Sequence, residues 1–458
     1  MRILTDLVAA ILVWGLAALP TISRAQESSL GTYSPYTMYG LGNLNRSPIS
    51  GFVGMGGASI GFRNVFADES GNGGFETTAD LRLNVANPAS LSAIPKRTFT
   101  FDVGLAGSNV YLMQRNPTLG TLRTSFNTFN FNNITIALPI AGKLGLALSV
   151  APYSEVGYKV HTDDESYLAD LGVVRYFYDG QGAVNEAKAA LGWEPFRGVS
   201  LGAEINYLWG NIDRTYQATI LPYTGSGQYN TISATTNEHV SRAFGAFGLQ
   251  ITPVSSTKTR LTLGATYRLG GTLNSDVTDF IPSGNIYDDV IRLDEFTSPT
   301  RMPQKIGAGF YFHRLRWAVG ADYVFEDWSR GNPYDAKNSV RYVDANTLKI
   351  GARYTPDRYD IRSRTGSFFN RVTYKAGVRT GGSYLEFRGE PMRERAVTLG
   401  LDIPFRAANV STVSLGLEYG ERGTLRQNLV KERYFKVNVG IMLFGRDYDY
   451  WFEKYKYN

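Results

Sequence analysis

The sequence of 458 residues contains no cysteine and only three histidines, His161, His239 and His313. The lack of cysteine excludes a disulfide framework. It also excludes a lipoprotein anchor, because that anchor requires a cysteine directly after the cleavage site. Long hydrophobic runs are missing as well, since no segment after residue 25 has 18 consecutive apolar residues. A transmembrane helix needs about 20 such residues, so none is predicted.

Neither positive nor negative charge is in large excess. Lys and Arg number 47 against 41 Asp and Glu, which gives a formal net charge of +6. The basic residues are spread along the chain without a basic run, which argues against nucleic acid as a partner. Aromatic residues make up 13% of the chain and glycines number 49, while the mean hydropathy is −0.20. This balance is typical of strands that are apolar on one face only.

Residues 1–25 have the features of an export signal. Arg2 precedes an apolar stretch from Leu7 to Leu19, and Ser23 and Ala25 are small residues at the two positions that a signal peptidase reads. We therefore assign residues 1–25 to a signal peptide. Export combined with the absence of cysteine is typical of a bacterial envelope protein.

From residue 96 onward one pattern recurs, with apolar residues at alternate positions. The segment VSLGAEINYLW at 199–209 places apolar side chains on one face and mostly polar side chains on the other. Such alternation predicts a β-strand, and no helical period competes with it. The predicted strands, fourteen in number, are 99–105, 134–138, 144–150, 187–193, 199–209, 247–251, 261–269, 306–312, 317–325, 348–354, 372–378, 397–403, 413–419 and 435–443.

The connections between these strands alternate in length. Short links such as 141–145 and 194–198 alternate with stretches of roughly 10 to 30 residues, as periplasmic turns alternate with external loops in outer-membrane barrels. Residues 174–178 also alternate, and we assign them to a loop or to an extension of the neighbouring strand, which keeps the strand number even. Aromatic residues gather near both ends of the strands, as they do at the two membrane interfaces. The sequence therefore predicts an all-β fold, a transmembrane antiparallel β-barrel of about fourteen strands over residues 96–446, located in the bacterial outer membrane with its apolar faces against outer-membrane lipid.

Residues 26–95 do not alternate. GFVGMGGASIGF at 51–62 is rich in glycine, and NVANPASLSAIP at 84–95 precedes the first strand. A segment of this length either plugs the lumen as a hatch or lies flexibly in the periplasm. At the other end, DYDYWFEKYKYN at 447–458 extends past the last strand. This periplasmic tail either docks a partner or lies on the inner interface of the membrane as an amphipathic end.

Four stretches together resemble the FadL-type family of transporters for long-chain fatty acids and hydrophobic compounds, particularly the versions found in Bacteroidota. The resemblance covers essentially the whole mature chain. It implies a fourteen-stranded barrel with an N-terminal hatch in the lumen. The stretches are GMGGASIG with NPASL (87–91), GAVNEAKAALGWEPFRGVSLGAEINYLWGNIDRT (182–215), GADYVFEDWS (320–329) and LEYGERGT (417–424).

The resemblance also implies two sites. Asn87, Pro88 and Ala89 match the family's Asn-Pro-Ala motif at the end of the hatch. The family uses a kink in its third strand as a lateral exit, which implies a possible opening at Pro152 and Gly157. Proline cannot donate to a strand ladder. Pro152 therefore either leaves a local gap in the wall or sits above the membrane, where the strand is already loosening.

Charged residues at positions that point into the lumen follow an ordered pattern on neighbouring strands, with acids on the first, bases on the next two and acids on the two after those. The first interpretation is a network of salt bridges that holds wall and hatch together. The second makes one of the cations the anchor for a ligand carboxylate in an otherwise apolar pocket, because a low dielectric strengthens such a pair. The residues are Asp322, Glu326, Lys349, Arg353, Lys375, Arg379, Asp402 and Glu418.

Enzymatic function has little support in the sequence. HTDDE at 161–165 combines one histidine with acids, a composition that is more often a solvated loop than a metal site or general base. GMGG lacks the spacing of a phosphate-binding turn. We expect no enzyme, no metal and no cofactor.

These observations predict an outer-membrane channel for the passive uptake of hydrophobic small molecules such as long-chain fatty acids. The alternative is an accessory barrel subunit of an outer-membrane machine for protein secretion or insertion, since one branch of the family in Bacteroidota serves the type IX secretion system. The channel binds a hydrophobic small molecule, whereas the subunit binds outer-membrane or periplasmic proteins.

Overall fold

The structure is a computed structural model, and it describes residues 31–46, 49–64, 82–94, 99–116, 120–164, 172–222, 231–256, 259–281, 291–330, 340–356, 368–404 and 411–444. The expected signal peptide at 1–25 and the expected tail at 447–458 lie outside the described residues. The chain from Gly31 onward forms one compact unit. No helix in the described part of the chain has the length and apolar character that a membrane crossing requires.

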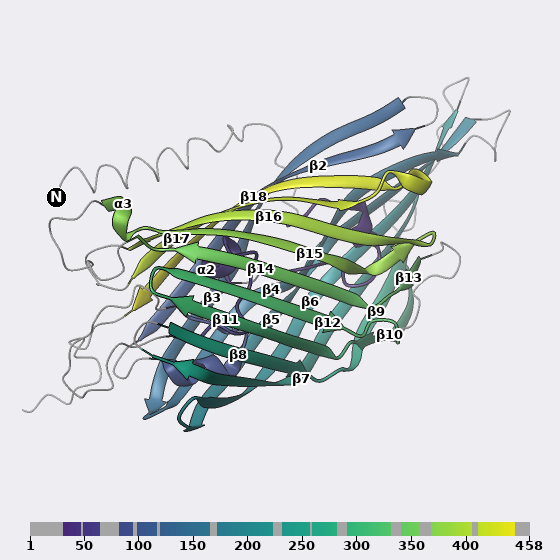
Figure 1. The fold of residues 1–458 in the computed structure, drawn as a ribbon. Helices are drawn as coiled ribbons and strands as arrows, with labels where there is room; N and C mark the ends of the chain where they lie inside the picture. The colour runs from purple at the N-terminus through teal and green to yellow at the C-terminus, as the bar shows by residue number, and fades with distance from the viewer. Residues whose placement is uncertain are drawn as a thin grey trace, which may run out of the picture. The chain divides into compact units, whose positions relative to one another are not determined.

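Strands make up most of the described residues, and the helices are short (Figure 1). The helices are η1 (Pro35–Met38), α2 (Ser50–Val53), η2 (Pro88–Ala93), α3 (Phe368–Arg371) and η4 (Arg426–Asn428). The strands are β1 (Asn43–Leu44), β2 (Thr100–Asn116), β3 (Gly120–Ala141), β4 (Leu144–Asp164), β5 (Gly172–Phe196), β6 (Val199–Pro222), β7 (Ile232–Ser255), β8 (Thr259–Arg268), β9 (Gly271–Ile281), β10 (Ile291–Met302), β11 (Lys305–Arg314), β12 (Trp317–Glu326), β13 (Val340–Tyr342), β14 (Ala345–Tyr354), β15 (Thr373–Phe387), β16 (Glu390–Pro404), β17 (Thr412–Gly423) and β18 (Val430–Phe444).

The sheet closes into a barrel because its last strand, β18, pairs antiparallel with β2. Three wall strands are interrupted and are each built from two elements: β8 with β9, β10 with β11, and β13 with β14. Since β1 belongs to the N-terminal segment, the wall is a fourteen-stranded antiparallel barrel. The predicted strand number is confirmed. Residues 174–178 extend β5, which is one of the two options that the sequence left open.

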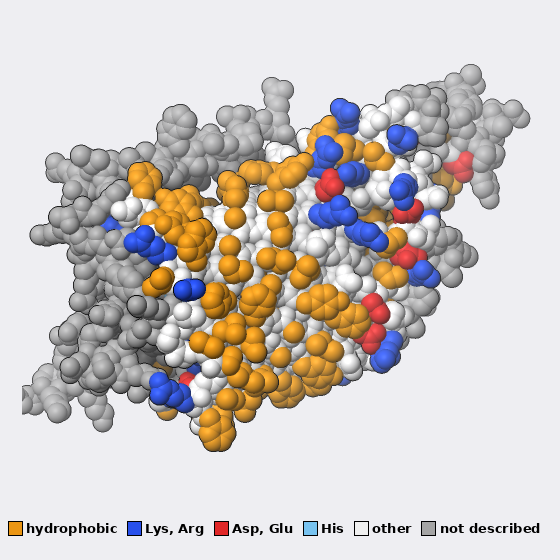
Figure 2. All heavy atoms as spheres, in the orientation of Figure 1, with side chains coloured by type: hydrophobic (Ala, Val, Ile, Leu, Met, Phe, Trp, Pro, Cys, Tyr) orange, Lys and Arg blue, Asp and Glu red, His pale blue; other side chains and the backbone are white. Residues whose placement is uncertain are grey.

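The outer surface of the barrel is apolar in the middle, as Figure 2 shows. In β6, Leu201, Ile205 and Tyr207 are 45%, 63% and 45% exposed, whereas Ser200 and Asn206 on the other face are buried. The alternating pattern therefore turns its apolar side outward. This orientation fits contact with lipid and does not fit a soluble sandwich, whose apolar faces would meet each other.

The N-terminal segment packs inside the barrel, so the hatch prediction is confirmed for its described residues. Phe52, Met55, Phe62 and Leu91 are at most 2% exposed. Phe62 stacks edge to face on Phe52 and on Tyr311 of β11, with ring centroids 5.0 and 5.1 Å apart. Apolar contacts of this kind fix the hatch to the wall.

Inward-facing glycines bring the hatch against the backbone of the wall. A Cβ atom on Gly202 would lie 2.3 Å from the amide nitrogen of Ala89, and one on Gly377 would lie 2.3 Å from that of Gly56. We call eight such positions the glycine belt, since a Cβ on each would meet a hatch atom at 2.2 to 2.8 Å. The belt consists of Gly145, Gly192, Gly202, Gly248, Gly264, Gly351, Gly377 and Gly400.

Candidate functional site

The strap, which we define as residues Gly31–Arg46, runs along the edge of β4. Its strand β1 pairs with β4, Asn43 opposite Glu155 and Leu44 opposite Ser154. The amide of Ser34 donates to the carbonyl of Gly157 at 2.8 Å, and the amide of Asn45 donates to that of Tyr153 at 2.9 Å. The strap is thus an extra strand that the hatch adds to the barrel wall.

The strap occupies a place where the wall itself is open. The ladder between β3 and β4 ends where Ile134 pairs with Val150. Beyond that pair, residues 120–133 of β3 pair with β2 only, within the described residues. We call the opening between residues 120–133 of β3 and 151–164 of β4 the seam. Val150 shares a cross-strand row with Ala187 and Tyr207, so the seam begins near the outer aromatic girdle that contains Tyr207.

The two residues predicted for a lateral opening both lie at this seam. Pro152 faces Asn185 of β5, the register shifts directly after it, and its carbonyl accepts a hydrogen bond from the Asn45 side chain at 3.3 Å. Gly157 accepts from the hydroxyl of Thr37 and donates its amide to the same oxygen, both at 3.1 Å. The structure therefore places both residues in contact with the strap.

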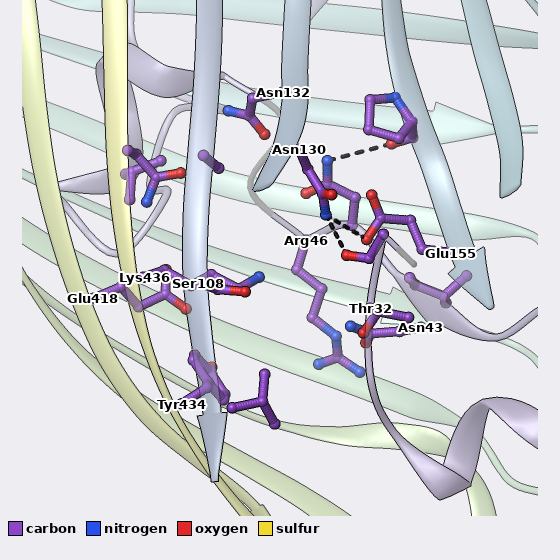
Figure 3. A pocket seen from close by; sticks show the side chains of 18 of the residues that line it. Thr32, Asn43, Arg46, Ser108, Asn130, Asn132, Glu155, Glu418, Tyr434 and Lys436 are labelled. Carbon is purple, nitrogen blue, oxygen red and sulfur yellow. Dashed lines mark hydrogen bonds between the residues drawn. The ribbon is translucent and has the colours of Figure 1, made fainter. Parts of the chain in front are cut away.

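A small polar cavity lies behind the seam, between the strap and strands β2, β3, β4 and β15 to β18 (Figure 3). The Asn130 side chain of β3 donates to Glu155 of β4 at 3.0 Å and also to the carbonyl of Gly31. The cavity has a volume of about 90 Å³, whereas pockets for drug-sized ligands have about 300 to 1,000 Å³. Its charged lining residues are Arg46, Arg379, Arg422, Lys436, Glu155, Glu394, Glu418 and Glu432.

Arg379 is the centre of a buried ion network in this cavity. Its guanidinium donates to Glu394 at 2.9 Å and to Glu418 at 2.5 Å. Arg46 of the strap lies 3.9 Å from the other oxygen of Glu394. Breaking a buried pair by removing one partner costs about 3 to 5 kcal/mol, because the remaining charge stays uncompensated. The network therefore ties the strap to the wall.

A second buried cluster joins the hatch to β15 and β16. Lys375 donates to Asp402 at 2.5 Å and to the carbonyl of Gly51 in the hatch at 2.6 Å. Arg82 of the hatch also forms an ion pair with Asp402. Burial lowers the pKa of Arg82 to about 10, which is still far above neutral pH, so the guanidinium stays charged in the network.

The other predicted lumen residues are divided between hatch and wall. Asp322 accepts the amides of Ser59 and Ile60 in the hatch at 2.6 and 2.9 Å. Lys349 donates to the carbonyl of Arg46 at 2.8 Å. Two further residues contact wall groups: Glu326 pairs with Lys305 at 3.0 Å, and the Arg353 guanidinium lies 5.7 Å from the ring centre of Tyr311.

A second cavity in the lumen is also charged. It has a volume of about 150 Å³ and lies between the strap, the hatch and strands β4 to β8, β11, β12 and β14. Pro152 and Lys349 contribute to its wall. Its remaining charged lining residues include Glu186, Lys188, Glu204, Arg268, Lys305, Asp322 and Glu326. An apolar pocket was expected for a hydrophobic ligand. The first cavity does not have that character, whereas the second combines its charged residues with apolar ones such as Phe52, Ile60 and Val324.

The motif Asn87, Pro88 and Ala89 lies where the hatch meets the wall. The Asn87 side chain caps η2 by accepting the amide of Ala89 at 3.1 Å. It donates to the carbonyl of Ile60 at 3.1 Å and to that of Leu249 in β7 at 3.2 Å. Pro88 and Ala89 fill the space left by glycines of the belt in β5, β6 and β7.

Reasoning from the sequence missed the strap and a rim contact of the hatch. Arg63 donates to Glu194 at 2.8 Å, beside the periplasmic turn after β5. Burial lowers the pKa of Arg63 to about 10, although the nearby Glu194 carboxylate opposes this shift. The available signal was the regular return of glycine at inward positions, for example Gly192 and Gly202, which marks a close approach of another backbone.

Metal ligation has no support in the described residues, where no three His, Cys, Asp or Glu side chains gather as ligands. His161 and His239 are exposed, and His313 is buried at the periplasmic end of β11.

Comparisons with known proteins agree with this fold. A family model described as BamG matches residues 7–458. No curated protein matches the chain in sequence. A Pseudomonas aeruginosa FadL homologue superimposes with a TM-score of 0.53 at 14% identity, covering 87% of this chain and 99% of that chain. The Pseudomonas putida toluene transporter TodX gives 0.52 at 16% identity, with 90% and 100% coverage. The fold is therefore that of an outer-membrane β-barrel of the FadL type, as the sequence resemblance predicted.

Proposed function

Because the chain belongs to the BamG family, we propose that it is an accessory barrel subunit of the BAM machinery that the family name implies. Its partners are then outer-membrane or periplasmic proteins, and its barrel serves as a scaffold. This proposal takes up the alternative that the sequence left open beside a channel for hydrophobic molecules.

The observation that carries the proposal is the fixed hatch. Ion pairs from Arg82 and Arg46 tie the hatch and the strap to the wall. At the glycine belt the backbones of hatch and wall are in direct contact. The two cavities described above are small, and each has several charged residues in its lining. Transport of a hydrophobic molecule requires an apolar path and a hatch that can move. The fixed hatch and the charged cavities therefore favour a scaffold over a channel.

The edge of β3 offers a surface for a protein partner. Along residues 120–133 the strand is paired on one side only, within the described residues. Leu122 and Phe129 on this stretch are 43% and 63% exposed. An unpaired strand edge with exposed apolar side chains is a template for pairing with another chain, and β-strand addition is a common mode of recognition.

Site-specific photocrosslinking in cells tests this proposal. A photoreactive residue replacing Leu122 or Phe129 should yield discrete crosslinks to protein partners, and the same partners should copurify in stoichiometric amount in mild detergent. Phe247 and Leu263, which are exposed on β7 and β8, serve as matched control positions in the lipid-facing wall. A barrel that purifies alone, with no crosslink above that of the controls, would contradict the proposal.

The remaining sequence assignments fit this function as proposals. Residues 1–25 act as the signal peptide, 26–95 as the hatch, 96–446 as the barrel and 447–458 as a periplasmic tail. A periplasmic tail rich in aromatic and charged residues is suited to docking a partner.

A channel for hydrophobic molecules is the second candidate, and the seam is the observation that favours it. The opening at Pro152 and Gly157 begins near the outer edge of the lipid-facing band. A hydrophobic molecule could pass between lumen and membrane at this place. In this case the strap must leave β4 during transport. The lumen cations Lys349, Arg353, Lys375 and Arg379 would then include the anchor for a ligand carboxylate.

A further inference from the structure

A cationic patch covers the external ends of the last three strands, on the outward face of the barrel. Arg393 and Arg395 of β16 and Lys431 and Arg433 of β18 alternate along their strands with inward residues. Figure 2 shows basic side chains gathered at this end of the barrel. We define the cationic patch as Arg388, Arg393, Arg395, Arg426, Lys431 and Arg433.

The patch has a clear excess of positive charge. Glu421 is its central carboxylate and lies 2.7 Å from Lys431 and 4.0 Å from Arg433. At the rim, Arg426 is 3.9 Å from Glu390. Among the described residues, Arg393 and Arg395 have no carboxylate within ion-pair distance. Six cations therefore face two carboxylates, Glu390 and Glu421.

Two exposed cations at the external ends of other strands each have a carboxylate of their own. Arg175 donates to Asp163 at 2.7 Å, and Arg341 lies 2.5 Å from Glu386. Like charges on adjacent strands repel one another unless an anion lies between them. An anion from outside the protein would therefore reduce the repulsion among the cations of the patch.

The patch lies one step outward from the aromatic girdle. Tyr419 and Phe435 are cross-strand partners, and both are exposed, at 53% and 44%. Two residues further along each strand, Glu421 lies opposite Arg433 in the strand register, and on its other side it lies opposite Arg395 of β16. Because aromatic girdles mark the membrane interface, the patch lies at the level of the outer lipid headgroups.

We propose that the cationic patch binds the phosphate groups of a phosphorylated glycolipid in the outer leaflet. Arginine suits this ligand because its planar guanidinium can donate two parallel hydrogen bonds to a phosphate. Basic residues at headgroup level attract anionic lipids. The acyl chains of the same molecule then lie against the apolar wall below Tyr419 and Phe435. One lipid thus contacts both the cationic patch and the apolar wall.

The test uses the full-length protein in a neutral detergent without phosphate, with two probes of equal acyl chains. These are phosphorylated lipid A and the same lipid A after phosphatase treatment, and binding is followed by native mass spectrometry. We expect the phosphorylated form to bind about tenfold more tightly or better. The variant with Arg393→Gln, Arg395→Gln and Arg433→Gln should lose this preference, whereas the three corresponding Arg→Lys substitutions should keep most of it.

The control variant carries Arg314→Gln and Arg316→Gln, two exposed arginines at the opposite end of the barrel, and should bind like the unchanged protein. Equal affinity for both lipids, or an unchanged preference in the triple Gln variant, would overturn the proposal. Inorganic phosphate that displaces the lipid at equal concentration would identify a site for soluble anions and would overturn it as well.

Discussion

At the residue scale, Asn87 joins three parts of the molecule with one side chain. Its amide donates to the hatch at Ile60 and to the wall at Leu249, while its oxygen caps η2 through Ala89. Asn87 is fully buried, so water cannot replace these contacts. A buried carbonyl that loses its donor pays the desolvation cost without compensation.

We predict that Asn87→Ala lowers the stability of the folded barrel by about 2 kcal/mol, since it removes the cap of η2 and the buried hydrogen bonds that Asn87 makes to hatch and wall. The measurement is the midpoint of thermal unfolding in detergent, followed by circular dichroism. Asn109→Ala is the matched control, because Asn109 bonds Asn127 at an exposed position. A change at Asn87 no larger than at Asn109 would show that the motif does not hold the hatch.

At the scale of elements, the strap completes a wall that its own strands leave open. The edge of β4 carries unpaired backbone groups from residue 151 onward, and β1 satisfies some of them at Ser154 and Glu155. The strap reaches β4 only because the hatch inside the barrel delivers it there. Hatch and wall are therefore one hydrogen-bonded structure at this place.

Locking the strap to β4 distinguishes the two candidate functions. The chain contains no cysteine, so Leu44→Cys with Ser154→Cys adds one defined pair. Directly opposed residues in antiparallel strands lie about 4.5 to 5.5 Å apart, which a disulfide can span. We expect the bond to form under oxidising conditions and to leave the scaffold function, measured as assembly of other outer-membrane barrels in cells, unchanged.

The Leu44→Cys variant alone is the control for this experiment, and reductant should reverse any effect of the lock. Loss of barrel assembly on oxidation would speak against a static strap. Loss of uptake of a hydrophobic compound on oxidation, with assembly unaffected, would instead support the channel.

At the scale of the whole molecule, the hatch closes the lumen both by filling it and by binding charged groups on the inner face of the wall. The lumen groups Asp322, Lys349, Lys375 and Asp402 all contact the hatch or the strap through hydrogen bonds or ion pairs. Without the hatch they would face an open, water-filled lumen. A fourteen-stranded wall has room for an aqueous passage once its plug is removed.

We predict that deletion of residues 26–94 converts a closed barrel into a conducting one. In planar bilayers the intact protein should show little ion conductance, whereas the deletion variant should show steps at least about tenfold larger, as wide barrels without a plug do. Circular dichroism of the deletion variant verifies that strand content is kept. Equal conductance of the two proteins would mean that the hatch does not seal the lumen.

The sequence determined the wall. Alternation of apolar and polar residues depends only on a period of two and on lipid outside, so the strands, their outward faces and their number could be predicted without any contact map. Leu201, Ile205 and Tyr207 are exposed where the pattern placed them. The charged lumen positions followed from the same alternation, but their partners did not.

The tertiary structure decided the hatch and the site. Arg82 and its partner Asp402 are 320 positions apart, and the strap meets β4 more than 100 positions away. These contacts depend on which inward glycines admit the hatch backbone and on which buried charges face it, and neither leaves a local period in the sequence. Contact with lipid stabilises each strand according to its own alternating pattern. The hatch is instead held by ion pairs and hydrogen bonds that form only once the barrel has closed around it.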